Sequence, residues 1–203
     1  MALFLVFSSS CSFCLDKSYK ERKMIKGGTG GANTVTGLVY EGQVDLATFL
    51  AAQEGYEIVK DFKGSVANVF YKGEEVAQIF KKHGLYAYLA KNGINWRDYL
   101  SSKLLPDDCI YVIINNTLFI IEVKHQSVKG STDEKLATCD FKRKQYRKLL
   151  SRLNVEVEFV YILCDWFKNN KYKDVLDYIV SVNCQYYFNY IPLQRLGLPV
   201  PQA

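Results

Sequence analysis

The chain has 203 residues, of which 49% are hydrophobic and 14% aromatic, and this is enough to bury one substantial core. The sequence contains no internal repeat, low-complexity segment or linker, which excludes repeat architectures and a string of separate domains. Its net charge of +5 is compatible with a polyanionic partner but does not identify one.

The N-terminus carries a short apolar run over residues 2–7, followed by small residues and two cysteines. The run is too short to span a membrane, and it lacks the basic residues that precede the apolar part of a signal peptide. Met24 stands directly before a glycine-rich loop, residues 24–36. We therefore predict that residues 1–23 are a dispensable extension, with a secretory signal as the alternative, and that residues 24–203 form a single domain.

The glycine-rich loop is not a Walker phosphate loop, because no Gly-Lys-Ser/Thr follows it. Its glycines allow close approach to another backbone or to a phosphate at the start of a helix. Apolar residues at helical spacing predict that helix over residues 34–53.

The rest of the chain alternates between strand and helix patterns. We expect strands over 56–59 and 66–71, helices over 74–90 and 96–104, a β-hairpin of strands 109–114 and 118–123, a helix over 130–150, a strand over 155–164, a helix over 171–182, a short strand over 185–188 and an irregular tail over 191–199. The hairpin turn is marked by Asn115 and Asn116. This order predicts an α/β (α+β) domain in which helices flank a mixed sheet.

Ionisable residues border the two apolar hairpin strands. Asp107 and Asp108 precede the first strand, and Glu122 and Lys124 end the second. Because side chains alternate along a strand, Glu122 and Lys124 are expected on one face and Val123 on the opposite one. Two converging carboxylates can hold Mg²⁺ through oxygen ligands, and the neighbouring ammonium can orient a water or offset charge on a phosphate. The alternative is a surface hairpin with a simple Glu122–Lys124 ion pair.

Pro106-Asp107, followed by Glu122-x-Lys124 at the end of an apolar strand, resembles the PD-(D/E)xK nuclease superfamily, which holds most type II restriction endonucleases. The resemblance implies a restriction-endonuclease-like fold. It also implies Mg²⁺, or Mn²⁺, held by Asp107 and Glu122, with Lys124 orienting the attacking water. Asp108 competes with Asp107 for the ligand role, and we favour the residue that directly follows Pro106.

The glycine loop and its following helix resemble the first helix of several restriction endonucleases. In that group a glutamate on this helix often turns towards the active site, and Glu41 is the matching position. The alternative is a solvated helix glutamate.

The helix after the hairpin is strongly basic. Lys144, Lys148 and Arg152 are expected opposite its apolar face, with Arg143 and Arg147 beside them. We predict that this face tracks DNA phosphates, with a merely solubilising role as the alternative. In the superfamily a glutamine of the corresponding helix can reach the site, which makes Gln145 a further candidate.

The six cysteines do not form a zinc-binding pattern with the two histidines, and thiols in apolar strands and helices are typical of a cytoplasmic, intracellular protein. Taken together, the sequence predicts a Mg²⁺-dependent DNA endonuclease, most consistent with a type II restriction enzyme that cuts double-stranded DNA as a homodimer, without a membrane partner. The alternatives are a repair or recombination nuclease of the same fold, and a nucleic-acid-binding protein without activity on that fold.

Overall fold

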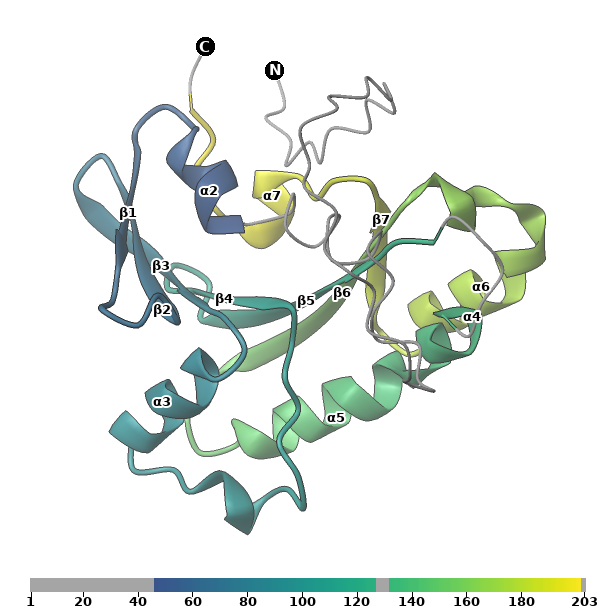
Figure 1. The fold of residues 1–203 in the computed structure, drawn as a ribbon, viewed down its shortest axis with the longest axis horizontal. Coiled ribbons are helices and arrows are strands. Elements are labelled where there is room, and N and C mark those ends of the chain that lie inside the picture. The colour runs from purple at the N-terminus through teal and green to yellow at the C-terminus, as the bar shows by residue number, and fades with distance from the viewer. Residues whose placement is uncertain (1–45, 127–131, 202–203) are drawn as a thin grey trace, which may run out of the picture.

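The computed structural model describes residues 46–126 and 132–201, and within these ranges one sheet lies between two layers of helices (Figure 1). The strands are β1 (Tyr56–Lys60), β2 (Val66–Tyr71), β3 (Glu74–Phe80), β4 (Asp108–Val112), β5 (Thr117–Lys124), β6 (Glu156–Leu163) and β7 (Gln185–Phe188). The α-helices are α2 (Leu46–Ala51), α3 (Gly84–Lys91), α4 (Thr132–Lys135), α5 (Cys139–Leu149), α6 (Lys173–Ser181) and α7 (Leu193–Leu196). Short 3-10 turns lie at Trp96–Asp98, Leu136–Thr138, Asp165–Lys168 and Asn170–Tyr172.

The seven strands are neighbours in the same order as in the chain. Strands β1 to β5 pair antiparallel, whereas β5, β6 and β7 are parallel to one another. Parallel neighbours need a crossover connection, and here α5 lies between β5 and β6 and α6 between β6 and β7. The predicted mixed sheet of an α/β-type domain is confirmed.

A hydrophobic core lies on each face of the sheet. One core joins the sheet to α3, α5 and α6 through residues such as Leu89, Leu149 and Ile179. The other joins it to α2 and α7 through Leu50 and Leu196. Figure 1 shows these two helical layers on opposite sides of the sheet. The central strands are therefore buried on both faces, as their long apolar runs predict.

The hairpin of β4 and β5 is confirmed, with Val112 opposite Thr117. Asn116 adopts a positive φ of 52°, a conformation that asparagine tolerates better than most residues. Its side chain accepts a hydrogen bond from Tyr111 Oη at 2.8 Å and donates one to the Asn154 carbonyl at 2.7 Å. The turn is thus fixed by its own asparagine.

The helix expected over residues 74–90 is wrong in its first half. Residues 74–80 form β3, which pairs with β2 through a tight turn, and only residues 84–91 are helical. Lys72 and Gly73 both have positive φ, of 50° and 85°, which is the geometry of a two-residue hairpin turn. The apolar residues of this segment fit the periods of both a helix and a strand, and pairing with β2, through the Lys72-Gly73 turn, and with β4 selects the strand.

The helix expected over residues 96–104 is also wrong, because only Trp96–Asp98 form a 3-10 turn. Leu104 instead uses its backbone N–H and carbonyl to bond the Tyr86 hydroxyl, at 2.8 and 2.9 Å. Pro106 lies just beyond and disfavours helical geometry in the residue before it. The segment that leads to β4 is therefore irregular and held by a side chain.

The remaining element predictions are largely confirmed. The helix expected over 130–150 is divided into α4, a 3-10 turn and α5, and the one expected over 171–182 corresponds to a 3-10 turn followed by α6. The strands expected over 56–59, 66–71, 155–164 and 185–188 are β1, β2, β6 and β7. The expected tail contains the short α7. Of the helix expected over 34–53, residues 46–51 form α2, and residues 34–45 lie outside the described residues.

Candidate active site

The strand β5 carries Glu122 and Lys124 at its C-terminal end, in the middle of the sheet. Ile121 and Val123 face the core with α2 and α7, so the alternation turns Glu122 and Lys124 towards the layer of α3 and α5. Lys124 Nζ lies 3.0 Å from Glu122 Oε2. The expected shared face of these two residues is present.

Asp107, directly before β4, joins this pair. Its Oδ2 lies 3.7 Å from Lys124 Nζ and accepts a hydrogen bond from the backbone N–H of Val123 at 3.2 Å. Asp108 is opposite Ile121 in the β4–β5 register, and side chains paired in this way share a face. Asp108 therefore belongs to the face opposite Glu122, and Asp107 is the aspartate that meets Glu122 and Lys124.

Lys142 on α5 is a member of the cluster that the sequence reasoning missed. Its Nζ lies 2.6 Å from Glu122 Oε1 and 2.8 Å from Oε2. Lys142, Tyr146 and Leu149 follow the spacing of a single helix face, and the last two are buried against the sheet. The sequence signal for Lys142 was a lysine on the otherwise apolar face of a helix. It was overlooked because many of the neighbouring residues are also basic.

The two carboxylates have opposite pKa shifts. Burial would raise the pKa of Glu122, but the ammonium groups of Lys124 and Lys142 together hold it below the ordinary value. Burial raises the pKa of Asp107, and Lys124 only partly offsets this. Glu122 is 7% exposed and Asp107 32%. The site therefore contains one strongly held carboxylate and one that is more easily protonated.

Two buried tyrosines lie beside the cluster of Asp107, Glu122, Lys124 and Lys142. Tyr161 on β6 is buried, and Lys124 Nζ lies 6.0 Å from the centroid of its ring. Tyr146 on α5 is also buried; burial raises its pKa, and the negative charges of Glu122 and Asp107 add to this. Both phenols stay protonated, and low-dielectric walls strengthen the charge interactions beside them.

Asp107 and Glu122 offer the donor chemistry that a hard divalent cation needs. Mg²⁺ is commonly held by one or two carboxylates and several waters. Among residues 46–126 and 132–201, no group of three or more His, Cys, Asp or Glu side chains is arranged to hold a metal ion. The ammonium of Lys142 contacts both Glu122 oxygens, which is where a cation would bind. The carboxylate pair fits Mg²⁺ provided that Lys142 gives way.

The predicted DNA-binding residues differ in exposure and in their place relative to α5. Lys144, Arg147 and Lys148 are exposed on α5, and Lys144 forms an ion pair with Asp140 at 2.7 Å. Arg152 is exposed but lies beyond the end of α5. Arg143 is half-buried, and its Nε makes no hydrogen bond within the described ranges. Gln145 is half-buried on α5.

Glu41, the glycine loop and residues 1–23 lie outside the described residues.

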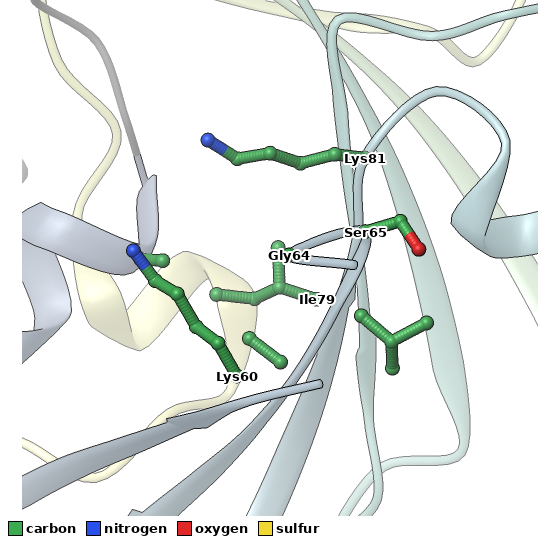
Figure 2. Close-up of a pocket in the computed structure, with 8 residues that line it drawn as sticks. Lys60, Gly64, Ser65, Ile79 and Lys81 are labelled. Atoms are coloured by element: carbon green, nitrogen blue, oxygen red, sulfur yellow. The ribbon is translucent and has the colours of Figure 1, made fainter. Parts of the chain in front are cut away.

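Two pockets lie outside the acidic cluster. The smaller has a cavity of ≈ 20 Å³, room only for water, and Figure 2 shows the side chains of Lys60 and Lys81 reaching to the same side of it, with Ile79 between them. The larger is a groove of ≈ 510 Å³ beside α3, with Tyr86, Trp96, Arg97 and Lys103 in its wall. Neither pocket includes Asp107, Glu122 or Lys124.

Comparisons with protein-family models, with curated proteins and with solved structures gave no match to the chain. Of the helices within the described ranges, none has the length and apolar character that a membrane crossing requires.

Proposed function

We propose that this protein is a Mg²⁺-dependent DNA endonuclease with a site of the PD-(D/E)xK kind and a restriction-endonuclease-like fold. One observation carries the proposal. Asp107, directly before β4, and Glu122 on β5 meet at the same Lys124 ammonium, at 3.7 and 3.0 Å. A surface ion pair would explain Glu122 and Lys124 alone, but it would not explain a second, half-buried carboxylate at the same point.

Asp107 and Glu122 would hold the metal, which supplies charge stabilisation at the phosphate and a more acidic water. The Val123 N–H fixes the Asp107 carboxylate against the end of β5. Lys124, held between the two carboxylates, would orient the attacking water and offset the charge that develops on the phosphate. Glu41 remains a proposed extra ligand. We further propose that the enzyme acts on double-stranded DNA as a homodimer, in the manner of a type II restriction enzyme.

Cleavage of a supercoiled plasmid tests the proposal. Purified full-length protein with Mg²⁺ or Mn²⁺ should give discrete fragments, and sequencing their ends would identify the site. Ca²⁺ should support binding without turnover, since it accepts looser coordination. Glu122→Gln should abolish cleavage, whereas Glu57→Gln, the same change on an exposed position of β1, should not. Full activity in excess chelator, or a fully active Glu122→Gln protein, would overturn the proposal.

Glu122→Gln also removes the partner of two ammonium groups, so its folding must be checked. Removing one partner of a buried ion pair costs about 3–5 kcal/mol, and less where the remaining charge is partly exposed, as Lys124 and Lys142 are. The double variant Glu122→Gln with Lys142→Met removes one of these unpaired charges. If it melts closer to the parent and still does not cut, the loss of cleavage belongs to the carboxylate and not to unfolding.

A structure-selective repair or recombination nuclease is the second candidate. The observation that favours it is the aromatic and cationic groove beside α3, because a partly exposed ring such as that of Trp96 suits an unpaired base. Such an enzyme would leave intact plasmid uncut and would cleave branched or partly single-stranded DNA. A binding protein without activity is less well supported, because Asp107, Glu122 and Lys124 are all present and in contact.

A further inference from the structure

The groove beside α3 has the size of a small-molecule site. Its ≈ 510 Å³ falls within the range of pockets that hold a ligand of nucleotide size. It lies between α3 and the 3-10 turn Trp96–Asp98, and both contribute to its wall. None of the described residues that line it is Asp or Glu, whereas Arg97, Lys103 and His83 do line it. Its charge favours an anion.

Two aromatic rings in the wall are held in fixed positions. Tyr86 is buried, and its hydroxyl is bonded to both the N–H and the carbonyl of Leu104. Trp96 packs edge-on against Tyr86, with 6.0 Å between the ring centroids, and is only partly buried. A ligand in the groove therefore meets a partly exposed Trp96 ring that Tyr86 supports from its edge.

The cations in the wall lie over these rings. The Arg97 guanidinium carbon is 4.7 Å from the centroid of the Trp96 ring, and Lys103 Nζ is 4.8 Å from the Tyr86 centroid and 5.4 Å from that of Trp96. Arg97 and Lys103 are exposed residues on long side chains, so each can leave its ring at little cost. An aromatic surface beside movable cations matches a ligand that joins a flat ring to a negative group.

We propose that this groove binds one unpaired nucleotide of a DNA strand. The base stacks on Trp96 in place of a cation, and its phosphate attracts Arg97 and Lys103. Paired bases are already stacked within a duplex and present only their edges, so an unpaired nucleotide is the form that can reach the ring. The proposal rests on the proposed function only in naming DNA as the nucleic acid.

The groove and the acidic cluster are connected through the chain. Leu104, which Tyr86 holds by two hydrogen bonds, lies shortly before Asp107. Tyr86 and Tyr146 also belong to the core on the face of the sheet to which Glu122 and Lys124 point. A strand with one nucleotide in the groove would therefore lie on the same side of the sheet as the carboxylates.

Fluorescence titration of full-length protein in chelator tests the groove without cleavage. The chain has two tryptophans, Trp96 and Trp166, so the Trp166→Phe protein reports on Trp96 alone. The probe is an eight-nucleotide thymidine oligomer, and the control probe is an abasic oligomer of the same length and charge. The thymidine oligomer should quench the fluorescence of Trp96, and the quenching should reach a plateau as the site fills. The abasic oligomer should bind about ten-fold more weakly, because it has no base to stack on the ring.

Variants separate stacking from general charge. Trp96→Leu in the otherwise natural chain should weaken binding of the thymidine oligomer about ten-fold and leave abasic binding unchanged, as measured by fluorescence anisotropy of labelled oligomers. Trp166→Leu is the matched control, since Trp166 also has a lysine over its ring, at 5.3 Å. If Trp96→Leu does not fold, the double variant Arg97→Gln with Lys103→Gln can be used instead, because it changes only exposed side chains. It should lower the affinity for both oligomers.

Equal affinity of the parent and Trp96→Leu for thymidine, or equal affinity of the parent for the two oligomers, would overturn the groove proposal. Plasmid cleavage in Mg²⁺ is measured separately. If the protein cuts plasmid but the oligomers show no stacking on Trp96, only the groove proposal is wrong. If the oligomers stack on Trp96 but the protein never cuts plasmid, only the nuclease proposal is wrong.

Discussion

Lys142 occupies the side of Glu122 on which a metal ion would bind. It contacts both carboxylate oxygens, while Lys124 contacts one. An ammonium at this point neutralises Glu122 in the metal-free protein, but it also repels and competes with a divalent cation. Under the proposed function, Lys142 would have to withdraw for a metal ion to bind Glu122, and the affinity for metal would include the cost of that withdrawal.

Lys142→Gln should raise the affinity for Mn²⁺ or Ca²⁺ about ten-fold, which corresponds to about 1.4 kcal/mol. Isothermal titration calorimetry without DNA measures this directly. Lys144→Gln is the matched control, because it removes the same charge from the same helix at a residue that pairs with Asp140 instead. Equal affinities for the parent and Lys142→Gln would show that Lys142 does not compete with metal.

Asp107 should destabilise the fold at neutral pH. Burial raises its folded pKa above the unfolded value of about 3.9. The stability gained from the protonated form is complete below the unfolded pKa and is lost as the pH rises through the folded pKa. Asp107→Asn should therefore raise the melting temperature at pH 7, and the difference should shrink below pH 4.

Asp61→Asn is a control of opposite sign. Backbone hydrogen bonds from Val66 and Ser65 lower the pKa of Asp61, so its ionised form stabilises the fold above the unfolded pKa. Asp61→Asn should lower the melting temperature at pH 7. If both variants shift it in the same direction, the electrostatic explanation for Asp107 is wrong.

The helix α5 has two faces with different partners. Successive residues turn by about 100° around a helix, so Lys144 and Lys148 lie on the side away from Lys142 and Glu122. Their exposure agrees with this arrangement. The face that was expected to track DNA therefore does not point at the carboxylates, and under the proposed function it would contact phosphates away from the cut.

Replacing Lys144, Lys148 and Arg152 by alanine should leave the cleavage rate at saturating DNA unchanged. Each phosphate contact that these residues make should appear as a loss of about one unit in the slope of log affinity against log salt, for all sequences alike. The melting temperature should hardly change, because exposed ion pairs such as Lys144–Asp140 contribute little. A slower rate at saturation would mean that this face reaches the scissile phosphate.

Strand alternation and turn chemistry allowed much of the fold to be predicted. They gave the β4–β5 hairpin and the shared face of Glu122 and Lys124, because both depend on neighbouring residues alone. Residues 74–80 were assigned to a helix because their apolar spacing suits either element, and tertiary pairing with β2 and β4 decides. Lys142 was missed for a related reason: its contact with Glu122 exists only once α5 has packed on the sheet.

At the scale of the whole molecule, the acidic cluster lies where two kinds of sheet meet. Asp107 directly precedes the antiparallel strand β4, Glu122 lies on β5 opposite Tyr161 of the parallel strand β6, and Lys142 belongs to the crossover helix that makes the parallel part possible. The cores on the two faces hold these parts together. The composition and element order were sufficient to predict the mixed sheet, but not that Lys142 would be the helix residue that contacts Glu122.

The order of the strands also has a kinetic consequence. Strands β1 to β3, and likewise β4 and β5, are joined by short turns, which close quickly, whereas residues 81–107, including α3, separate β3 from β4. The parallel strand β6 must wait for α5 to be synthesised and to fold back. A chain synthesised only as far as Lys124 thus holds Asp107, Glu122 and Lys124 but not Lys142, the second ammonium group beside Glu122. The charged centre can be complete only after α5 has been synthesised and has packed on the sheet.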